Sequence, residues 1–202
     1  MFSGAQVSLY PMTDDFVGVI VGALGALEPY RRTFRIETDD ISTLLVGPPD
    51  ELFPAMRDLF VAAAASGIHC VLAATVSRGC PGEPADPICT PFGGVAHDRP
   101  LRERIAAAMA QATQAPRTGQ VVAAQFSLYP LGDQHHMDEI YACIEFLKRS
   151  GVFDRSKNFC TVLRGDAGPV FATLSEAFLH FGAPQGHIAL DLKVSANSPT
   201  NA

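Results

Sequence analysis

The sequence predicts an α+β protein made of two tandem copies of one small βαββαβ unit, and two observations support this fold class. First, the segment AQVSLYP at residues 5–11 returns as AQFSLYP at residues 124–130, with one apolar residue exchanged for another. Second, the hydrophobic period switches between strand and helix spacing in the same order in both halves. The order strand, helix, two strands, helix, strand is the ferredoxin-like plan, an antiparallel sheet with both helices on one face.

The repeat extends well beyond this segment. After a one-residue shift, identical residues continue at Thr43 and Thr161, Leu45 and Leu163, Gly47 and Gly165, Phe53 and Phe171, Phe60 and Phe178, His69 and His187, and Ser77 and Ser195. We therefore predict a first repeat at residues 1–78, a connector at 79–120 and a second repeat at 121–202. Each copy has roughly 75 residues, a size at which a domain is only marginally stable alone, so we expect the copies to dock onto each other.

Each copy opens with a strand and a helix. In the first copy the strand covers residues 6–10, where apolar Val7 and Leu9 alternate with polar side chains. A helix follows, because apolar residues recur at helical spacing over residues 16–27, and residues 137–147 repeat this pattern.

The rest of the copy is a hairpin, a second helix and a closing strand. Two β-rich runs within residues 33–46, divided by an acidic turn, predict the hairpin, and residues 153–164 are its counterpart. A second apolar stripe at helical spacing covers residues 52–63. The closing strand is clearest at residues 187–195, where apolar and polar residues alternate. Residues 79–120 are rich in Pro and Gly at first and then carry one short helix, which is typical of a connector.

The composition is that of an ordinary globular protein, with 202 residues of which 48% are hydrophobic and 18% charged. A formal net charge of −6 with scattered basic residues argues against nucleic acid as a partner, since phosphate backbones select for clustered positive charge. Five cysteines, an odd number without a C-x-x-C spacing, favour reduced thiols. No basic leader and no long apolar run is visible, so we expect a soluble cytoplasmic protein without membrane insertion.

Polar residues shared by both copies are the first candidates for a ligand site. If Val7 and Leu9 lie under the helices, then Gln6, Ser8 and Tyr10 project from the open face of the sheet. Their counterparts in the second copy are Gln125, Ser127 and Tyr129. The pattern fits the solvent side of an amphipathic strand as well as a shared ligand-binding or docking role, and the sequence leaves both open.

The hairpin around Asp39, Asp40 and Thr43 is the second candidate, and Thr161 matches Thr43 in the other copy. Hydroxyls and strand-edge amides can pair with the alternating donors and acceptors of a heteroaromatic ring, and an aspartate can face a cationic one. Aspartate pairs also favour turns by bonding the local backbone, which is the interpretation we favour for Asp40.

No catalytic or metal-binding constellation emerges, so we expect neither an enzyme nor a metal site. His69 and His187 each open a strand, and no partner motif accompanies them. The histidine pair at 135–136, with Asp138, lacks a known ligand spacing and is interpreted as a solvated helix start. Cys80 lies in a Gly-Cys-Pro-Gly turn without an identifiable activating neighbour.

Four short segments in order along the chain resemble the YkoF family of thiamine/hydroxymethylpyrimidine-binding proteins. They are SLYPMTDDF at 8–16, TDDIST at 38–43, GCPG at 79–82 and SANSP at 195–199. The resemblance covers essentially the whole chain. It implies tandem ferredoxin-like repeats of the ACT-like kind, a homodimer, and one pyrimidine-binding pocket per repeat. It implies binding for transport or salvage without catalysis, with thiamine as a ligand rather than a cofactor and a membrane transporter as one possible partner.

Transferred residue by residue, the resemblance places the first pocket at Ser8, Leu9 and Thr43, with Asp39 nearby. The matching residues of the second copy are Ser127, Leu128 and Thr161. The two leucines would act through their backbone groups, because their side chains point into the core.

Two differences bear on the ligand. Asp40 stands where the family motif has a histidine, and the second copy has Lys157 and Asn158 in place of the aspartate pair. We therefore expect the pockets to differ in affinity for a cationic thiazolium, with one of them preferring the neutral pyrimidine.

Two other functions are compatible with this fold class. One is a cofactor-free enzyme of the ferredoxin-like type, which would need an acid or base with a perturbed pKa in its pocket. The other is an ACT-like regulatory module for another small molecule, which would co-purify with an enzyme.

Overall fold

The computed structural model describes residues 3–79, 99–131, 136–182 and 187–201. The first half consists of β1 (Ser3–Pro11), α1 (Phe16–Leu24), the short 3-10 helix η1 (Gly25–Tyr30), β2 (Arg35–Thr38), β3 (Thr43–Val46), α2 (Pro49–Ala64) and β4 (Cys70–Arg78). Helix α3 (Leu101–Ala112) follows. The second half consists of β5 (Val121–Leu131), α4 (His136–Arg149), β6 (Phe153–Ser156), β7 (Thr161–Asp166), α5 (Ala167–His180), β8 (His187–Ala196) and the 3-10 turn η3 (Pro199–Asn201).

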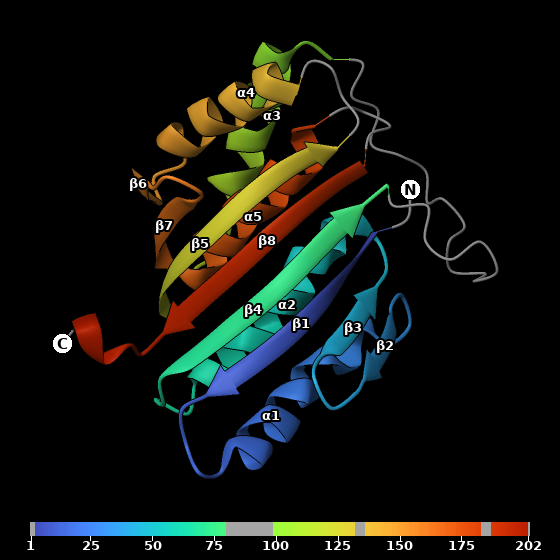
Figure 1. Cartoon of the computed structure of the whole chain (residues 1–202), viewed down its shortest axis with the longest axis vertical. Helices are drawn as coiled ribbons and strands as arrows, with labels where there is room; N and C mark the ends of the chain where they lie inside the picture. The colour runs from blue at the N-terminus through green and yellow to red at the C-terminus, as the bar shows by residue number, and fades with distance from the viewer. Residues whose placement is uncertain (1–2, 80–98, 132–135, 183–186, 202) are drawn as a thin grey trace.

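The predicted fold class is confirmed, and the structure adds how the halves are joined. The eight strands form one sheet in the order β2-β3-β1-β4-β8-β5-β7-β6, and all neighbours are antiparallel. Strand β4, the edge of the first half, pairs along its whole length with β8, the edge of the second, from Cys70 opposite Ala196 to Arg78 opposite Ile188 (Figure 1). This pairing removes two exposed sheet edges at once. The boundaries at 78/79 and 120/121 stay a prediction, because residues 80–98 lie outside the described part.

The helices cover one face of this sheet, with α2 and α5 side by side at its centre (Figure 1). Four phenylalanines that the two copies share meet there. The ring of Phe53 lies 5.4 Å from that of Phe178, and the ring of Phe60 lies 6.3 Å from that of Phe171, and all four side chains are buried. Each pair joins one repeat to the other, so the docking expected from the size of the copies takes place through repeated core residues.

The shared histidines also contact the opposite repeat. His69 Nε2 lies 3.1 Å from Ser195 Oγ, and His187 Nε2 lies 3.0 Å from Ser77 Oγ. Both histidines stand at the start of a strand, as expected. The sequence pattern within one copy does not reveal their partners, because each partner is a serine of the other repeat. These two equivalent hydrogen bonds flank the β4–β8 junction.

Helix α3 is anchored by a buried ion pair. The Arg104 guanidinium donates to both carboxylate oxygens of Glu139 on α4, at 3.0 and 2.5 Å, and to the His180 carbonyl at the end of α5, at 2.6 Å. The Gly182 amide donates to the same carboxylate at 2.8 Å. Arg78 of β4 completes the cluster by donating to two carbonyls of the second half, and burial lowers the pKa of Arg78 to about 10.

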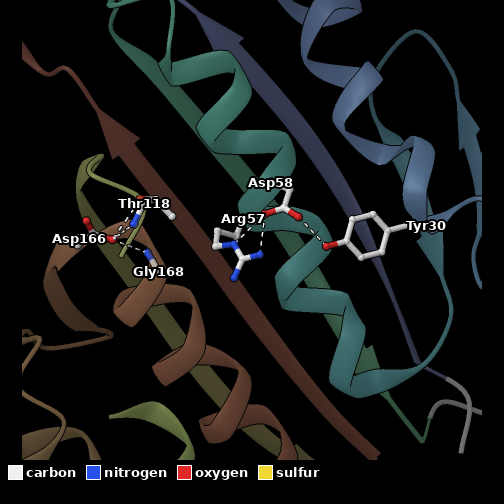
Figure 2. Close-up of polar contacts among 6 residues, drawn as sticks. All are labelled: Tyr30, Arg57, Asp58, Thr118, Asp166 and Gly168. Atoms are coloured by element: carbon white, nitrogen blue, oxygen red, sulfur yellow. Dashed lines mark hydrogen bonds and ion pairs between the residues drawn. The ribbon is translucent and has the colours of Figure 1, made fainter. Parts of the chain in front are cut away.

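Two further polar clusters tie segments to the helix layer (Figure 2). The Tyr30 hydroxyl donates to Asp58 on α2 at 2.7 Å, and Arg57 donates to the other oxygen of that carboxylate at 2.8 Å. Burial and the Asp58 carboxylate raise the pKa of Tyr30 well above its usual value. On the other side, Asp166 caps α5 by accepting from the Gly168 amide at 2.9 Å, and it also accepts from the amide and hydroxyl of Thr118.

The Asp166 cluster predicts a pH-dependent contribution to stability. Burial alone would raise the pKa of Asp166, but the amides of Thr118, Gly168 and Gly119 outweigh it and hold this pKa below its usual value. A carboxyl with a lowered pKa in the folded state stabilises the fold above its unfolded pKa of about 4 and loses that contribution as the pH falls towards the folded value. Asp166→Ala is therefore expected to lower the free energy of unfolding by about 1–2 kcal/mol at neutral pH.

The difference between wild type and Asp166→Ala should shrink as the pH falls below about 4. Urea unfolding of both proteins across a pH series measures it. A difference that does not change with pH would contradict the role given to the ionised carboxylate.

Candidate functional site

Two pockets occupy equivalent places in the two halves, beside the turn of each short hairpin. The first has a cavity volume of about 100 Å³ and lies between β1, α1 and the β2–β3 turn; Ile20, Leu24 and Leu59 line its apolar side. The second has a volume of about 260 Å³ and lies between β5, α4 and the β6–β7 turn; its apolar side includes Ile140, Cys143, Ile144 and Leu147. Burial raises the pKa of the Cys143 thiol, so that thiol acts as an apolar wall.

The unpaired edge of a long strand forms the polar side of each pocket. The ladder between β1 and β3 ends at Val7 opposite Thr43, while β1 continues to Pro11. The Ser3 carbonyl accepts from the Gly47 amide on the β3 side, so by alternation the N–H and C=O of Leu9 point to that side as well. No β3 residue stands opposite Leu9 in the ladder. Its side chain packs against the core, which leaves a backbone donor and acceptor at the pocket edge.

The turn that closes the first pocket is held by its own polar groups. The Asp39 carboxylate accepts from the amides of Ile41 and Ser42, both at 2.8 Å, and these bonds lower the pKa of Asp39. Ser8 Oγ donates to the Ile41 carbonyl at 3.0 Å, and Ser42 Oγ donates to Gln6 Oε1 at 3.0 Å. Thus Gln6 and Ser8 latch the turn onto β1, which gives these repeated residues a structural role.

The second pocket repeats the same latch with different residues. Ser127 Oγ donates to the Phe159 carbonyl at 2.5 Å, and Cys160 Sγ lies 3.8 Å from Gln125 Oε1, where the first copy has Ser42 and Gln6. The ladder between β5 and β7 ends at Phe126 opposite Thr161, so Leu128 holds the place of Leu9. The Lys157 amide donates to the Cys160 carbonyl at 2.8 Å and closes the turn.

The fold brings the residues expected from the sequence to these two pockets. Ser8, Leu9, Asp39 and Thr43 line the first. Ser127, Leu128 and Thr161 line the second. Thr43 is largely buried, and its hydroxyl lies 3.0 Å from that of Thr38.

Sequence reasoning missed the residues at the tips of the turns. Ile41 is 76% exposed and Phe159 is 89% exposed, and both belong to the pocket linings. A large apolar residue is unusual at an exposed turn position, and here it occurs at the same position of both copies. That repetition could have identified Ile41 and Phe159 from the sequence. The wall residues Leu24 and Ile144 belong to the apolar stripes that predict the two helices, and both are half-buried at the pockets.

Other candidates from the sequence do not form sites among the described residues. In that part of the chain no group of three or more His, Cys, Asp or Glu side chains is placed to hold a metal ion. His135 and nearly all of the Gly-Cys-Pro-Gly segment at 79–82 lie outside the described residues. None of the described helices has the length and apolar character needed to span a membrane.

Comparison with known proteins supplies the family. A sequence model described as the YKOF-related family matches residues 2–83 and 121–201, one stretch in each repeat. The chain belongs to the YKOF-related family. Among curated proteins of this kind, one from Bacillus subtilis (strain 168) is named "Putative HMP/thiamine-binding protein YkoF" and is 34% identical over 198 residues, which is 98% of this chain and 92% of that protein. The match in both repeats agrees with the two equivalent pockets.

Proposed function

We propose that this YKOF-related protein binds thiamine, or its hydroxymethylpyrimidine half, without catalysing a reaction, and that each repeat holds one ligand. The observation that carries the proposal is the pair of equivalent pockets, each with a free strand edge facing half-buried aliphatic walls. The name of the Bacillus subtilis relative, a thiamine- and HMP-binding protein, supports the choice of ligand. We further propose that the protein acts in the cytoplasm as a homodimer and delivers its ligand for transport or salvage.

The strand edge suits an aminopyrimidine. Such a ring carries an acceptor nitrogen beside a donor amino group, and Leu9 offers an N–H and a C=O on the same side of β1. The ring would extend the ladder by the two hydrogen bonds that β3 leaves unmade, with its faces against Leu24 on α1 and the exposed Ile41 of the turn. In the second pocket, Leu128, Ile144 and Phe159 would hold the ring in the same way, with an aromatic face available for stacking.

Filling each pocket separately tests the proposal. Leu24→Trp places a large ring in the first pocket and Ile144→Trp does so in the second, so each variant should lose one of two binding sites while the double variant loses both. Isothermal titration calorimetry with thiamine and with hydroxymethylpyrimidine measures the number of sites. Because each wall residue is half-buried at the pocket rather than deep in the core, we expect the variants to fold.

Matched controls lie on the same two helices. Val21 on α1 and Tyr141 on α4 are each 63% exposed and line neither pocket, so Val21→Trp and Tyr141→Trp should bind as the wild type does. Absence of heat with thiamine, hydroxymethylpyrimidine and thiamine phosphates at high protein concentration would refute the proposed function. If the NMR spectrum of the mixture showed that the protein converts the ligand into a product, the protein would be an enzyme and the proposal of binding without catalysis would be refuted.

A further inference from the structure

The two pockets carry opposite charges at equivalent positions. Two carboxylates, those of Asp39 and Asp40, line the first pocket, and none of its lining residues is basic. Lys157 lines the second pocket, and none of its lining residues is acidic. The two turns have the same backbone closure, a donor amide at Asp39 or Lys157 and an acceptor carbonyl three residues later, so the charges stand at matching places.

Both sets of charges are available to a ligand. Asp39 is ionised, since its carboxylate is held by two turn amides that lower its pKa, and its side chain stays at the surface. Among the residues that the structure describes, no side chain forms an ion pair or hydrogen bond with the Lys157 ammonium. Arg155, two residues earlier, is already paired with Asp154 and does not line the cavity.

The surroundings of Lys157 suit an anionic group. Ser156 and Asn158 line the same cavity. A serine hydroxyl and an asparagine side-chain amide can donate hydrogen bonds to phosphate oxygens, while the Lys157 ammonium supplies the charge. The cavity of about 260 Å³ is also larger than the first one, at about 100 Å³, which leaves room beyond the ring.

From this arrangement we infer that the second pocket selects a phosphorylated, anionic form of the pyrimidine ligand, whereas the first selects the cationic form. The inference rests on the proposed function, because it assumes that both pockets bind the pyrimidine ring. It then concerns the charged group attached to that ring. A phosphate monoester carries a charge of roughly −1.5 to −2 at pH 7. Opposite charges about 4 Å apart near a protein surface change affinity by about tenfold.

The test uses the single-pocket proteins and three ligands of different charge. Leu24→Trp leaves the second pocket open and Ile144→Trp leaves the first. Each is titrated with thiamine, with neutral hydroxymethylpyrimidine and with hydroxymethylpyrimidine phosphate. The second pocket should bind the phosphate about tenfold more tightly than the neutral compound, and the first should bind thiamine most tightly and the phosphate most weakly.

Charge variants assign the effect to named side chains. In the Leu24→Trp background, Lys157→Gln should reduce the ratio of phosphate affinity to neutral affinity by about tenfold, while Lys148→Gln, which changes an exposed lysine of α4 outside the cavity, should leave the ratio unchanged. In the Ile144→Trp background, Asp40→Asn should raise the same ratio. In about 1 M NaCl the affinities of the three ligands for one pocket should differ less, since salt screens the charges.

The outcomes separate the inference from the proposed function. If both pockets bind neutral hydroxymethylpyrimidine and also bind hydroxymethylpyrimidine phosphate with equal affinity, the inference is overturned and the proposed function still holds. Absence of binding for all three ligands would overturn both.

Discussion

Replacing Glu139 by alanine is expected to lower the free energy of unfolding by roughly 3–5 kcal/mol, the largest effect of any single polar substitution considered for this chain. Glu139 is only 7% exposed, and its carboxylate is the counter-charge of Arg104, which is 5% exposed. Removing it leaves the guanidinium buried beside that of Arg78 without a compensating anion, and it also removes the acceptor of the Gly182 amide. Urea-induced unfolding followed by circular dichroism measures the change.

Two controls isolate the buried charge. Glu145 lies on the same helix and pairs with Arg149 at 3.5 Å at the surface, so Glu145→Ala should change the free energy of unfolding by less than about 1 kcal/mol. The double variant Arg104→Met with Glu139→Leu should be more stable than Glu139→Ala, because it removes the buried Arg104 guanidinium together with its counter-charge. A Glu139→Ala protein as stable as Glu145→Ala would refute the role of the ion pair in anchoring α3.

Replacing Phe178 by alanine is expected to cost roughly 3–5 kcal/mol and to destabilise both repeats together. The Phe178 ring is fully buried on α5, lies 5.4 Å from Phe53 of the other repeat, and has the Arg78 guanidinium 5.8 Å from its centre. Because the two repeats share this core, unfolding should remain a single transition at a lower denaturant concentration.

Phe159→Ala is the matched control for that substitution. Its ring is 89% exposed, so the free energy of unfolding should change by less than about 0.5 kcal/mol. Two separate transitions in Phe178→Ala, with the first repeat unfolding at the wild-type midpoint, would show that the repeats do not stabilise each other.

The pocket positions were predictable because they depend on local patterns. A strand that alternates, followed by a hairpin with Asp39 at its turn and Thr43 after it, places Ser8 and the Leu9 backbone next to that turn in any ferredoxin-like sheet. The charge difference between Asp39 and Lys157 is equally visible in the sequence. The latch from Ser8 to the Ile41 carbonyl was not predictable, since it depends on how far β1 extends beyond β3.

Several repeated residues were harder to interpret because their partners are far away in the sequence. From the sequence, His69 and Phe53 were interpreted within the first copy alone. In the structure His69 contacts Ser195 and Phe53 contacts Phe178, both in the second copy. Repetition of a residue in both copies can therefore indicate a role in the interface between the copies as well as a role in a ligand site.

By itself the sequence determined the duplication, the βαββαβ order and the chemical character of each turn, because these follow from periodicity and local hydrogen bonding. Only the tertiary structure decided that β4 and β8 pair to make one eight-stranded sheet, and that Arg104, Glu139 and Arg78 meet in its helix layer. The physical reason is that edge pairing and burial of charge depend on contacts between residues far apart in the sequence, from 35 positions between Arg104 and Glu139 to 126 between Cys70 and Ala196. Such contacts leave no periodic pattern along the chain.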